Sequence, residues 1–301
     1  MAYFFERDET FTEGFRRIGA EENKAAIDAL ACEAEAMPEG IHQARRCFKR
    51  LRSLFRLFRS ALGKDAFREA NRFYQGAARE LASLRDISSL IEAANLLREE
   101  YGSLLKADAF DGLLALLEEE KTAREQNLPG QASEAERVLQ ALREARGRFT
   151  GLELKGTGKE AMLKELTHCY RKARLFYHQC QEAPTPEAMH EWRKQGKHLW
   201  HAHLLLHKAW PKVFKGYAKA YKALGDALGD YHDLALLQRK LADYGGLLPD
   251  DTRRLLHGLA QEHLREQWRQ ALDLGQRLHA EKPGAFRRRM AAVLKGRAAS
   301  K

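Results

Sequence analysis

The sequence lacks the features that would place the chain in a membrane or a secretory pathway. No apolar run approaches the roughly 20 residues that a membrane-spanning helix needs. The N-terminal stretch MAYFFERDETF has neither the basic start nor the long apolar segment of a signal peptide. Cysteine is scarce: the 301 residues hold four, and no two form a CxxC pair. We therefore expect reduced thiols, no structural zinc site and a cytoplasmic protein.

Strand patterns are also missing. Alternation of apolar and polar residues with a period of two is not sustained anywhere in the chain. The seven prolines fall between long segments of 3.6-residue periodicity that are rich in good helix formers. These segments predict an all-α fold with helices over residues 10–36, 40–62, 64–98, 103–127, 131–149, 158–182, 186–208, 212–243, 249–281 and 284–297.

Acidic residues are absent from HQARRCFKRLRSLFRLFRS, residues 42–60, which carries seven lysines and arginines. At about 100° per residue, most of the basic residues fall on one stripe and the apolar residues on the opposite face. Here Arg45 stands with Lys49, and Arg52 with Arg56, at i,i+4, where each like-charge pair costs roughly 0.2–0.5 kcal/mol. A solvated helix face remains an alternative, but the bare charge favours an anionic partner, as does the net charge of +10.

The basic stripe occurs twice. With an offset of 148 residues, MHEWRKQGKHLWHAHLLL repeats IHQARRCFKRLRSLFRLF. The glycine-containing stretch LELKGTGKE separates two half-repeats, 10–150 and 157–297, which predict two similar helical bundles related by a pseudo-twofold axis. The second copy of the stripe is weaker, since Trp200 and Leu204 stand where the first copy has arginines.

Phosphate is the anion that suits these stripes best, because arginine and lysine bind phosphate oxygens through charge-assisted hydrogen bonds. Binding of single-stranded nucleic acid would need aromatic side chains among the charges. The first stripe has none, because Phe48, Phe55 and Phe58 lie toward the apolar side. No compact helix-turn-helix pattern indicates a reader of duplex DNA. A phosphate polymer without bases therefore fits better, and a nucleic acid on the same surface is the alternative.

The repeated pattern H-x-x-R-[RK]-x-x-[KR]-x-L resembles the CHAD family, whose name abbreviates a histidine α-helical domain. The resemblance covers essentially the whole chain, 1–301. It implies two four-helix-bundle halves in pseudo-twofold symmetry, with inorganic polyphosphate bound along a basic cavity between them. The residues that it assigns to polyphosphate are His42, Arg45, Arg46, Lys49, Arg52 and Arg56 in the first half and His190, Arg193, Lys194, Lys197 and His201 in the second.

Other basic residues on the same or neighbouring predicted helices are further candidate contacts. They are Arg17, Lys24, Arg50, Arg72, Lys172, His198, Lys208, Lys219 and Lys222. Some family members associate with polyphosphate granules. Many carry a triphosphate-tunnel domain with an ExExK strand motif, which this sequence lacks. We therefore expect a stand-alone module.

Metal and catalytic sites are less well supported. His203 and His207 have the i,i+4 spacing of a helical metal site, but no carboxylate completes an HExxH pattern. The stretch YHDL, residues 231–234, resembles the His-Asp pair of metal-dependent phosphohydrolases, which need further ligands in order. We therefore expect a binding protein rather than an enzyme, without metal or cofactor. The sequence leaves the oligomeric state open.

Overall fold

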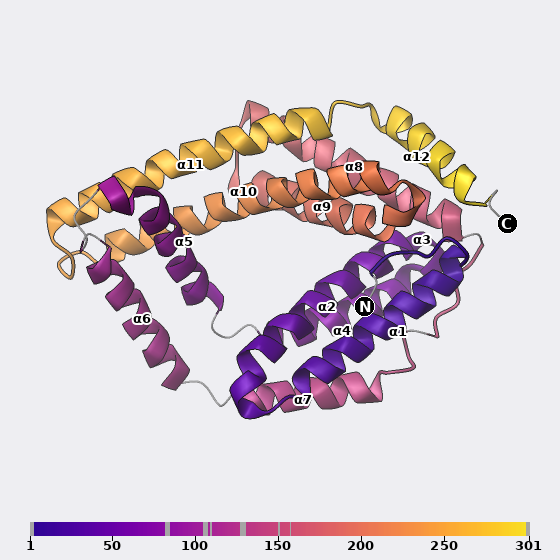
Figure 1. Ribbon diagram of the computed structural model, residues 1–301, viewed down its shortest axis with the longest axis horizontal. Coiled ribbons are helices and arrows are strands. Elements are labelled where there is room, and N and C mark those ends of the chain that lie inside the picture. Colours follow the sequence, from indigo (N-terminus) through magenta and orange to yellow (C-terminus); the bar gives the residue numbers. More distant parts are fainter. Residues whose placement is uncertain are drawn as a thin grey trace. The chain divides into compact units, whose positions relative to one another are not determined.

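Helices form the regular structure of the chain in the computed structural model (Figure 1), which describes residues 3–81, 85–104, 108, 110–126, 131–149, 151–156 and 158–298. The all-α prediction is confirmed for these residues, apart from one isolated bridge between Gly245 and Leu248. No helix in the described ranges is long and apolar enough to cross a membrane. The helices are α1 (Phe11–Leu30), α2 (Met37–Leu57), α3 (Arg59–Leu62), α4 (Lys64–Glu80), α5 (Arg85–Tyr101), α6 (Asp111–Gln126), α7 (Gln131–Glu144), α8 (Gly158–Glu182), α9 (Pro186–Leu205), α10 (Pro211–Asp243), α11 (Asp250–Leu278) and α12 (Pro283–Ala298).

Helix starts follow local sequence signals. Thr10 caps α1 in a capping box with Glu13, and Thr185 caps α9 by accepting a hydrogen bond from the backbone of the third helical residue. Proline is the first residue of α9, α10 and α12. The N–H group at this position makes no hydrogen bond within a helix, so its absence in proline costs nothing. Pro38 was expected in a gap but lies in the first turn of α2, which tolerates proline for the same reason.

The prediction of one helix over 64–98 is wrong. The structure has two helices there, because α4 ends at Glu80 and α5 begins at Arg85. The first predicted helix, 10–36, also ends early, at Leu30. The backbones of α1 and α2 approach closely at this end: a Cβ added to Gly40 would lie 2.3 Å from the Ala29 carbonyl oxygen. The chain must therefore leave α1 before α2 can pack against it.

The helices form two compact units. Unit 1 comprises residues 1–81, 129–222 and 277–301, and unit 2 comprises residues 82–128 and 223–276. Both units draw on both halves of the sequence, and α10 and α11 each contribute to both. The half-repeats 10–150 and 157–297 and their pseudo-twofold symmetry therefore stay predictions.

Unit 1 has an aromatic core. Phe15 packs edge-to-face on Phe55 with ring centroids 5.5 Å apart, and Tyr74 stacks on Phe55 at 5.9 Å. In the part built on α8, Tyr170 stacks on Phe286 of α12 with centroids 4.0 Å apart. All five rings are at most 1% exposed, so these helices are held together mainly by apolar burial. This packing fixes α2, one of the two predicted basic helices. The other, α9, is held on α8 by Trp192 and Tyr177, whose ring centroids lie 5.3 Å apart.

Unit 2 has a separate aliphatic core. Its buried residues come from α5, α6, α10 and α11, and Leu97, Leu113, Leu237 and Leu256 are fully buried among them. A carboxylate links two helices of this unit. Glu120 of α6 accepts a hydrogen bond from Tyr244 at 2.9 Å and pairs with Lys240 of α10 at 2.7 Å.

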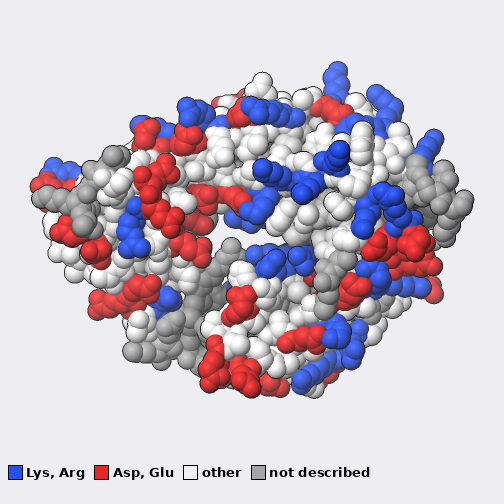
Figure 2. Space-filling model, in the orientation of Figure 1, with Lys and Arg blue, Asp and Glu red and all other residues white. Residues whose placement is uncertain are grey.

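Charge is divided very unequally between the units. Unit 1 holds 41 lysines and arginines against 23 acidic residues, a net charge of +18, whereas unit 2 holds 11 against 19, a net charge of −8. Figure 2 shows groups of lysine and arginine side chains over α2 and α9, whereas acidic side chains gather over α5 and α6. The positive charge of the chain is therefore a property of unit 1.

Candidate functional site

The α2 helix presents its basic stripe to solvent. It packs on α1 and α4 through an apolar face on which Cys47, Leu51 and Leu54 are buried, as the periodicity predicts. The exposed members of the stripe are His42, Arg46 and Lys49, and the partly exposed members are Arg45, Arg52 and Arg56. The sequence therefore gave the correct outward face for this helix.

The α9 helix is more deeply embedded than α2. It packs on α8 through residues that include Trp192 and Leu199, both fully buried. Of the predicted contacts on α9, His190 is exposed and Arg193, Lys194 and Lys197 are partly buried. The stripe on α9 therefore offers less accessible charge than the one on α2.

Within unit 1, α2 and α9 pack against each other, which brings the two stripes together. The Ser53 hydroxyl of α2 lies 3.5 Å from Nδ1 of His198 on α9. Burial lowers the pKa of His198 well below its usual value, and the nearby charges of Arg56, Arg52 and Lys194 add to this effect. Cations of both helices therefore lie close enough to His198 to act on its charge.

Arg52 and Arg56 are the most confined cations of the α2 stripe. The Arg52 Nε donates to Asn71 Oδ1 at 3.1 Å, and the Arg56 guanidinium lies over the Phe67 ring, 5.5 Å from its centroid. Burial lowers the pKa of both guanidinium groups, and the charge of Arg56 lowers that of Arg52 further. Neither arginine pairs with a carboxylate in the described ranges, and the Arg56 Nε has no hydrogen-bond partner. The charges of Glu165 and Glu191 act on Arg56 without forming an ion pair, so they offset the repulsion only in part.

Other members of the stripes are positioned by short contacts. The Arg45 guanidinium donates to the Leu81 carbonyl at 2.6 Å, which ties α2 to the end of α4. Arg46 donates to Gln43 Oε1 at 3.0 Å on the helix surface. On α9, Lys194 pairs with Glu191 at 2.6 Å, so part of its charge is compensated. These contacts orient the three cations.

His201 does not lie on the exposed face that the sequence predicted. It is 6% exposed and meets the Tyr3 ring edge-to-face, with centroids 5.8 Å apart. Burial lowers its pKa to about 3, and Arg50, Lys197 and Lys49 contribute. The imidazole is therefore neutral at physiological pH and is covered by the N-terminal segment.

Several further candidates are engaged within the protein. Arg50 pairs at 3.0 Å with Glu22, which is 2% exposed, and so neutralises a buried carboxylate. Arg17 bonds to Glu9, Glu21 and the Phe4 carbonyl, Lys24 pairs with Asp28, and Lys208 pairs with Glu6. These arrangements give Arg50 and Arg17 structural roles.

The remaining candidates are at the surface of unit 1. Arg72 of α4, Lys172 of α8, and Lys219 and Lys222 of α10 are all exposed. Their positions are compatible with ligand contacts, and the structure does not test their roles.

Sequence reasoning missed the residues that support the stripe from other helices. Asn71 and the Leu81 carbonyl bind stripe arginines but have no signal in the sequence, because such contacts depend on packing. Arg59 could have been predicted from the sequence, because it follows Arg56 at i+3. Its guanidinium also lies over Phe67, 5.4 Å from the ring centroid.

Comparison with known proteins agrees with this arrangement. The CHAD domain family model matches residues 23–242 of the chain. The crystal structure of the CHAD domain from the plant Ricinus communis resembles it with a TM-score of 0.64 and 20% sequence identity, over 94% of this chain and 96% of that chain. No curated protein matches the chain significantly. The family match spans well over half of the residues, and the chain belongs to the CHAD domain family.

Proposed function

We propose that this chain binds inorganic polyphosphate along the basic residues of α2 and α9. The observation that carries the proposal is the contact between these helices, which gathers Arg52 and Arg56 of α2 near Lys194 of α9. The two arginines are partly buried and lack a carboxylate partner in the part of the chain that is described. A polyanion would offset the repulsion that remains between these cations.

The shape of the stripe supports a polymeric ligand over a compact one. The cations of α2 recur at nearly every helical turn, which is about 5.4 Å along the axis, from His42 to Arg56. An extended chain with one charge per unit can meet such a row, whereas a single small anion can meet only a fraction of it. Arginine forks would bind pairs of phosphate oxygens and lysines would contribute point charges. The basic cavity between two symmetric halves is part of the same proposal.

Competition decides between polyphosphate and the alternative, a nucleic acid. Labelled polyphosphate bound to the chain is displaced with single-stranded or double-stranded nucleic acid of equal total charge, at physiological salt. We expect polyphosphate to bind more tightly, and its affinity to fall steeply with salt because counterions are released on binding. Stronger binding of either nucleic acid would overturn the proposal in favour of the alternative.

The proposed role is binding without catalysis. The test is release of orthophosphate from polyphosphate with and without added Mg²⁺ or Mn²⁺, and we expect none above background. The proposal also places the protein in the cytoplasm, on polyphosphate granules. Imaging of a tagged chain in cells with and without polyphosphate tests that location.

A further inference from the structure

A second basic region of unit 1 adjoins the C-terminal end of the α2 stripe, since Arg59 and Arg56 both lie over the Phe67 ring. A pocket of about 560 Å³ opens between α3, the start of α4 and α8, and its charged lining comprises Arg59, Lys64, Lys164, Glu165, His168 and Arg171. Gly63 turns the chain from α3 into α4 with φ of +84°, a backbone conformation that favours glycine. This turn sets Arg59 and Lys64 on the same side as α8.

The cations of this pocket are exposed and unpaired. Arg59, Lys64, Lys164 and Arg171 are all exposed, and none forms an ion pair with any described residue. Other exposed cations of this protein bond to a carboxylate one helical turn away, as Arg254 does to Asp251. The four positive charges converge on an open concave surface without an ion-pair partner among the described residues.

The one carboxylate in the pocket is poorly placed to compensate them. Glu165 is 8% exposed, and burial raises the pKa of its carboxyl against the opposing effects of Arg59, a hydrogen bond with Ser60 and Lys164. Burial also lowers the pKa of His168, and the next contributions come from Lys172 and Arg59. Burial is thus the main cause of both shifts, and the neighbouring cations add to that of His168.

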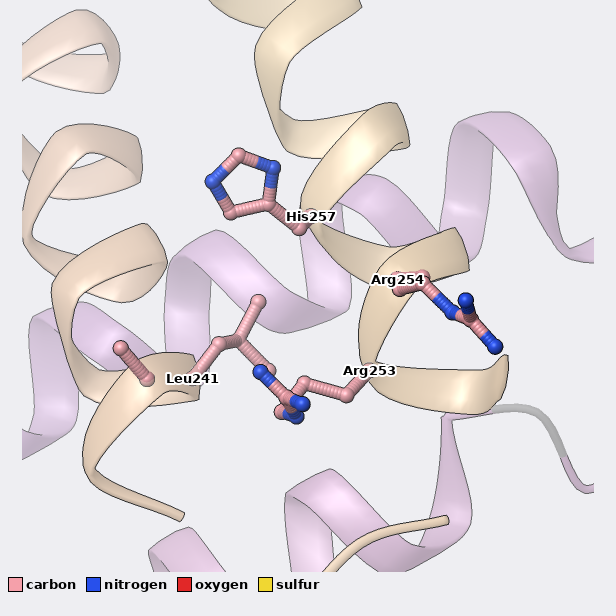
Figure 3. Close-up of a pocket in the computed structure, with 5 residues that line it drawn as sticks. Leu241, Arg253, Arg254 and His257 are labelled. Carbon is pink, nitrogen blue, oxygen red and sulfur yellow. The ribbon is translucent and has the colours of Figure 1, made fainter. Parts of the chain in front are cut away.

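The described pocket of unit 2 makes a useful contrast (Figure 3). It measures about 150 Å³ and is lined by Leu241, Ala242, Arg253, Arg254 and His257. Arg253 reaches toward Leu241, whereas Arg254 points away from it. The two arginines bond to Asp250 and Asp251 at 2.8 and 2.6 Å, respectively. Both arginines of that pocket have a carboxylate partner, whereas the cations of the unit 1 pocket form no ion pair with any described residue.

We propose that the pocket between α3 and α8 binds a compact phosphate group, either a small free phosphate anion such as pyrophosphate or the terminal phosphate of a polyphosphate chain. A concave cluster of two arginines and two lysines suits a multiply charged group that several donors can surround. A terminal phosphate carries more charge than an internal one, and its free oxygens can enter a pocket. None of the four cations belongs to the α2 and α9 stripes. Binding of a polyphosphate end rests on the function proposed for the stripes, whereas binding of a free anion does not.

The test removes two pocket cations and compares the loss with a matched control. The pocket variant is Lys164→Ala with Arg171→Ala, and the control is Lys212→Ala with Lys215→Ala on α10. Both pairs remove two exposed, unpaired positive charges from helices of unit 1. Calorimetric titration with pyrophosphate should show at least about a tenfold loss for the pocket variant and less than about twofold for the control. Equal losses in the two variants, with unchanged thermal unfolding, would overturn the proposal.

A second titration identifies the source of the phosphate. It uses linear polyphosphate with free ends and the same polymer with its ends capped as phosphoramidates. If the pocket binds the end of the polyphosphate polymer, the pocket variant should lose affinity only for the uncapped polymer. Binding of a free anion predicts unchanged affinity for both polymers while pyrophosphate binding falls. If pyrophosphate binding stays intact and both polymers weaken equally, the pocket is only part of the polymer surface and the proposal fails.

Discussion

Unit 1 and unit 2 use their basic residues in different ways. In unit 2, arginines along α11 each bond to a carboxylate three residues earlier, as in the pairs Arg253–Asp250, Arg254–Asp251, Arg265–Glu262 and Arg269–Glu266. In unit 1, Arg52 and Arg56 of α2 and the cations of the α3–α8 pocket have no such partner among the described residues. The net charge of +10 therefore conceals a division between one unit with locally paired charges and one with a large uncompensated excess. That excess, rather than the overall charge, is what indicates a polyanionic ligand.

The largest expected effect tests whether the uncompensated charge of unit 1 binds the polyanion. Replacing Arg45, Arg46 and Lys49 of α2 with alanine should weaken polyphosphate binding by about a hundredfold, because three charge-assisted contacts are lost. Fluorescence titration with labelled polyphosphate at fixed salt measures the change.

The control removes Arg254, Arg265 and Arg269 from α11 of unit 2, which takes away the same number of charges. Those arginines are exposed and paired, so the affinity should change by less than about twofold. Similar losses in both variants would mean that net charge alone drives binding and that the distinction between the units has no functional content.

A second prediction concerns acid stability, which should also differ between the units. Burial lowers the pKa of His203 in unit 1 to about 4, and Arg289 adds to the shift while a hydrogen bond with the Leu199 carbonyl opposes it. The unfolded chain takes up this proton near pH 6.5 and the folded chain does not, so stability is lost as the pH falls from 6.5 toward 4. The free energy of unfolding should therefore fall by about 2 kcal/mol between pH 7 and pH 5 through this group alone.

Urea unfolding of the wild type and of His203→Phe at both pH values measures that contribution. The variant should lose about 2 kcal/mol less than the wild type on acidification. The control is His263→Phe in unit 2, which also replaces a buried histidine by phenylalanine. The prediction would be contradicted if the wild type and the His203 variant lost the same free energy of unfolding between pH 7 and pH 5.

A smaller effect is expected from the second copy of the stripe. Replacing Arg193, Lys194 and Lys197 of α9 with alanine should weaken polyphosphate binding by about tenfold, which is less than for the α2 variant. Two reasons support the inequality: the α9 cations are more buried, and Lys194 is already paired with Glu191. Titration under the conditions used for the α2 variant compares the two directly. Equal losses would show that the asymmetry of the two sequence copies has no functional counterpart.

Helix positions could be predicted from the sequence because the signals for them are local. Proline marks the first residues of α9, α10 and α12, and α8 has the predicted bounds, 158–182. The break between α4 and α5 was missed. No proline lies in residues 64–98, and the helix ends where the Leu81 carbonyl accepts a bond from Arg45, 36 residues away in sequence.

The same limit applies to the site. The outward face of α2 followed from its periodicity, but a helical wheel does not show what covers a side chain from elsewhere. Arg50 was a candidate contact, and the structure pairs it with the buried Glu22 of α1. His201 was placed on a basic face, and Tyr3 covers it from the N-terminal segment. Residue types and periodicity therefore located the basic region, whereas only the packing separated outward-facing cations from those with structural contacts.

The smallest expected effect is a dependence of polyphosphate affinity on pH, which should come from histidines of unit 1 and not of unit 2. His42 and His190 are exposed on the two stripes, and an imidazole donates to phosphate better when it is protonated. Polyphosphate affinity should therefore rise about threefold between pH 7.5 and pH 6, and the variant with both residues replaced by glutamine should lose most of that rise. The matched control replaces the exposed His232 and His257 of unit 2, which should leave the rise intact. A flat profile in the wild type would remove both stripe histidines from the binding role and leave arginine and lysine as the ligands of the phosphate chain.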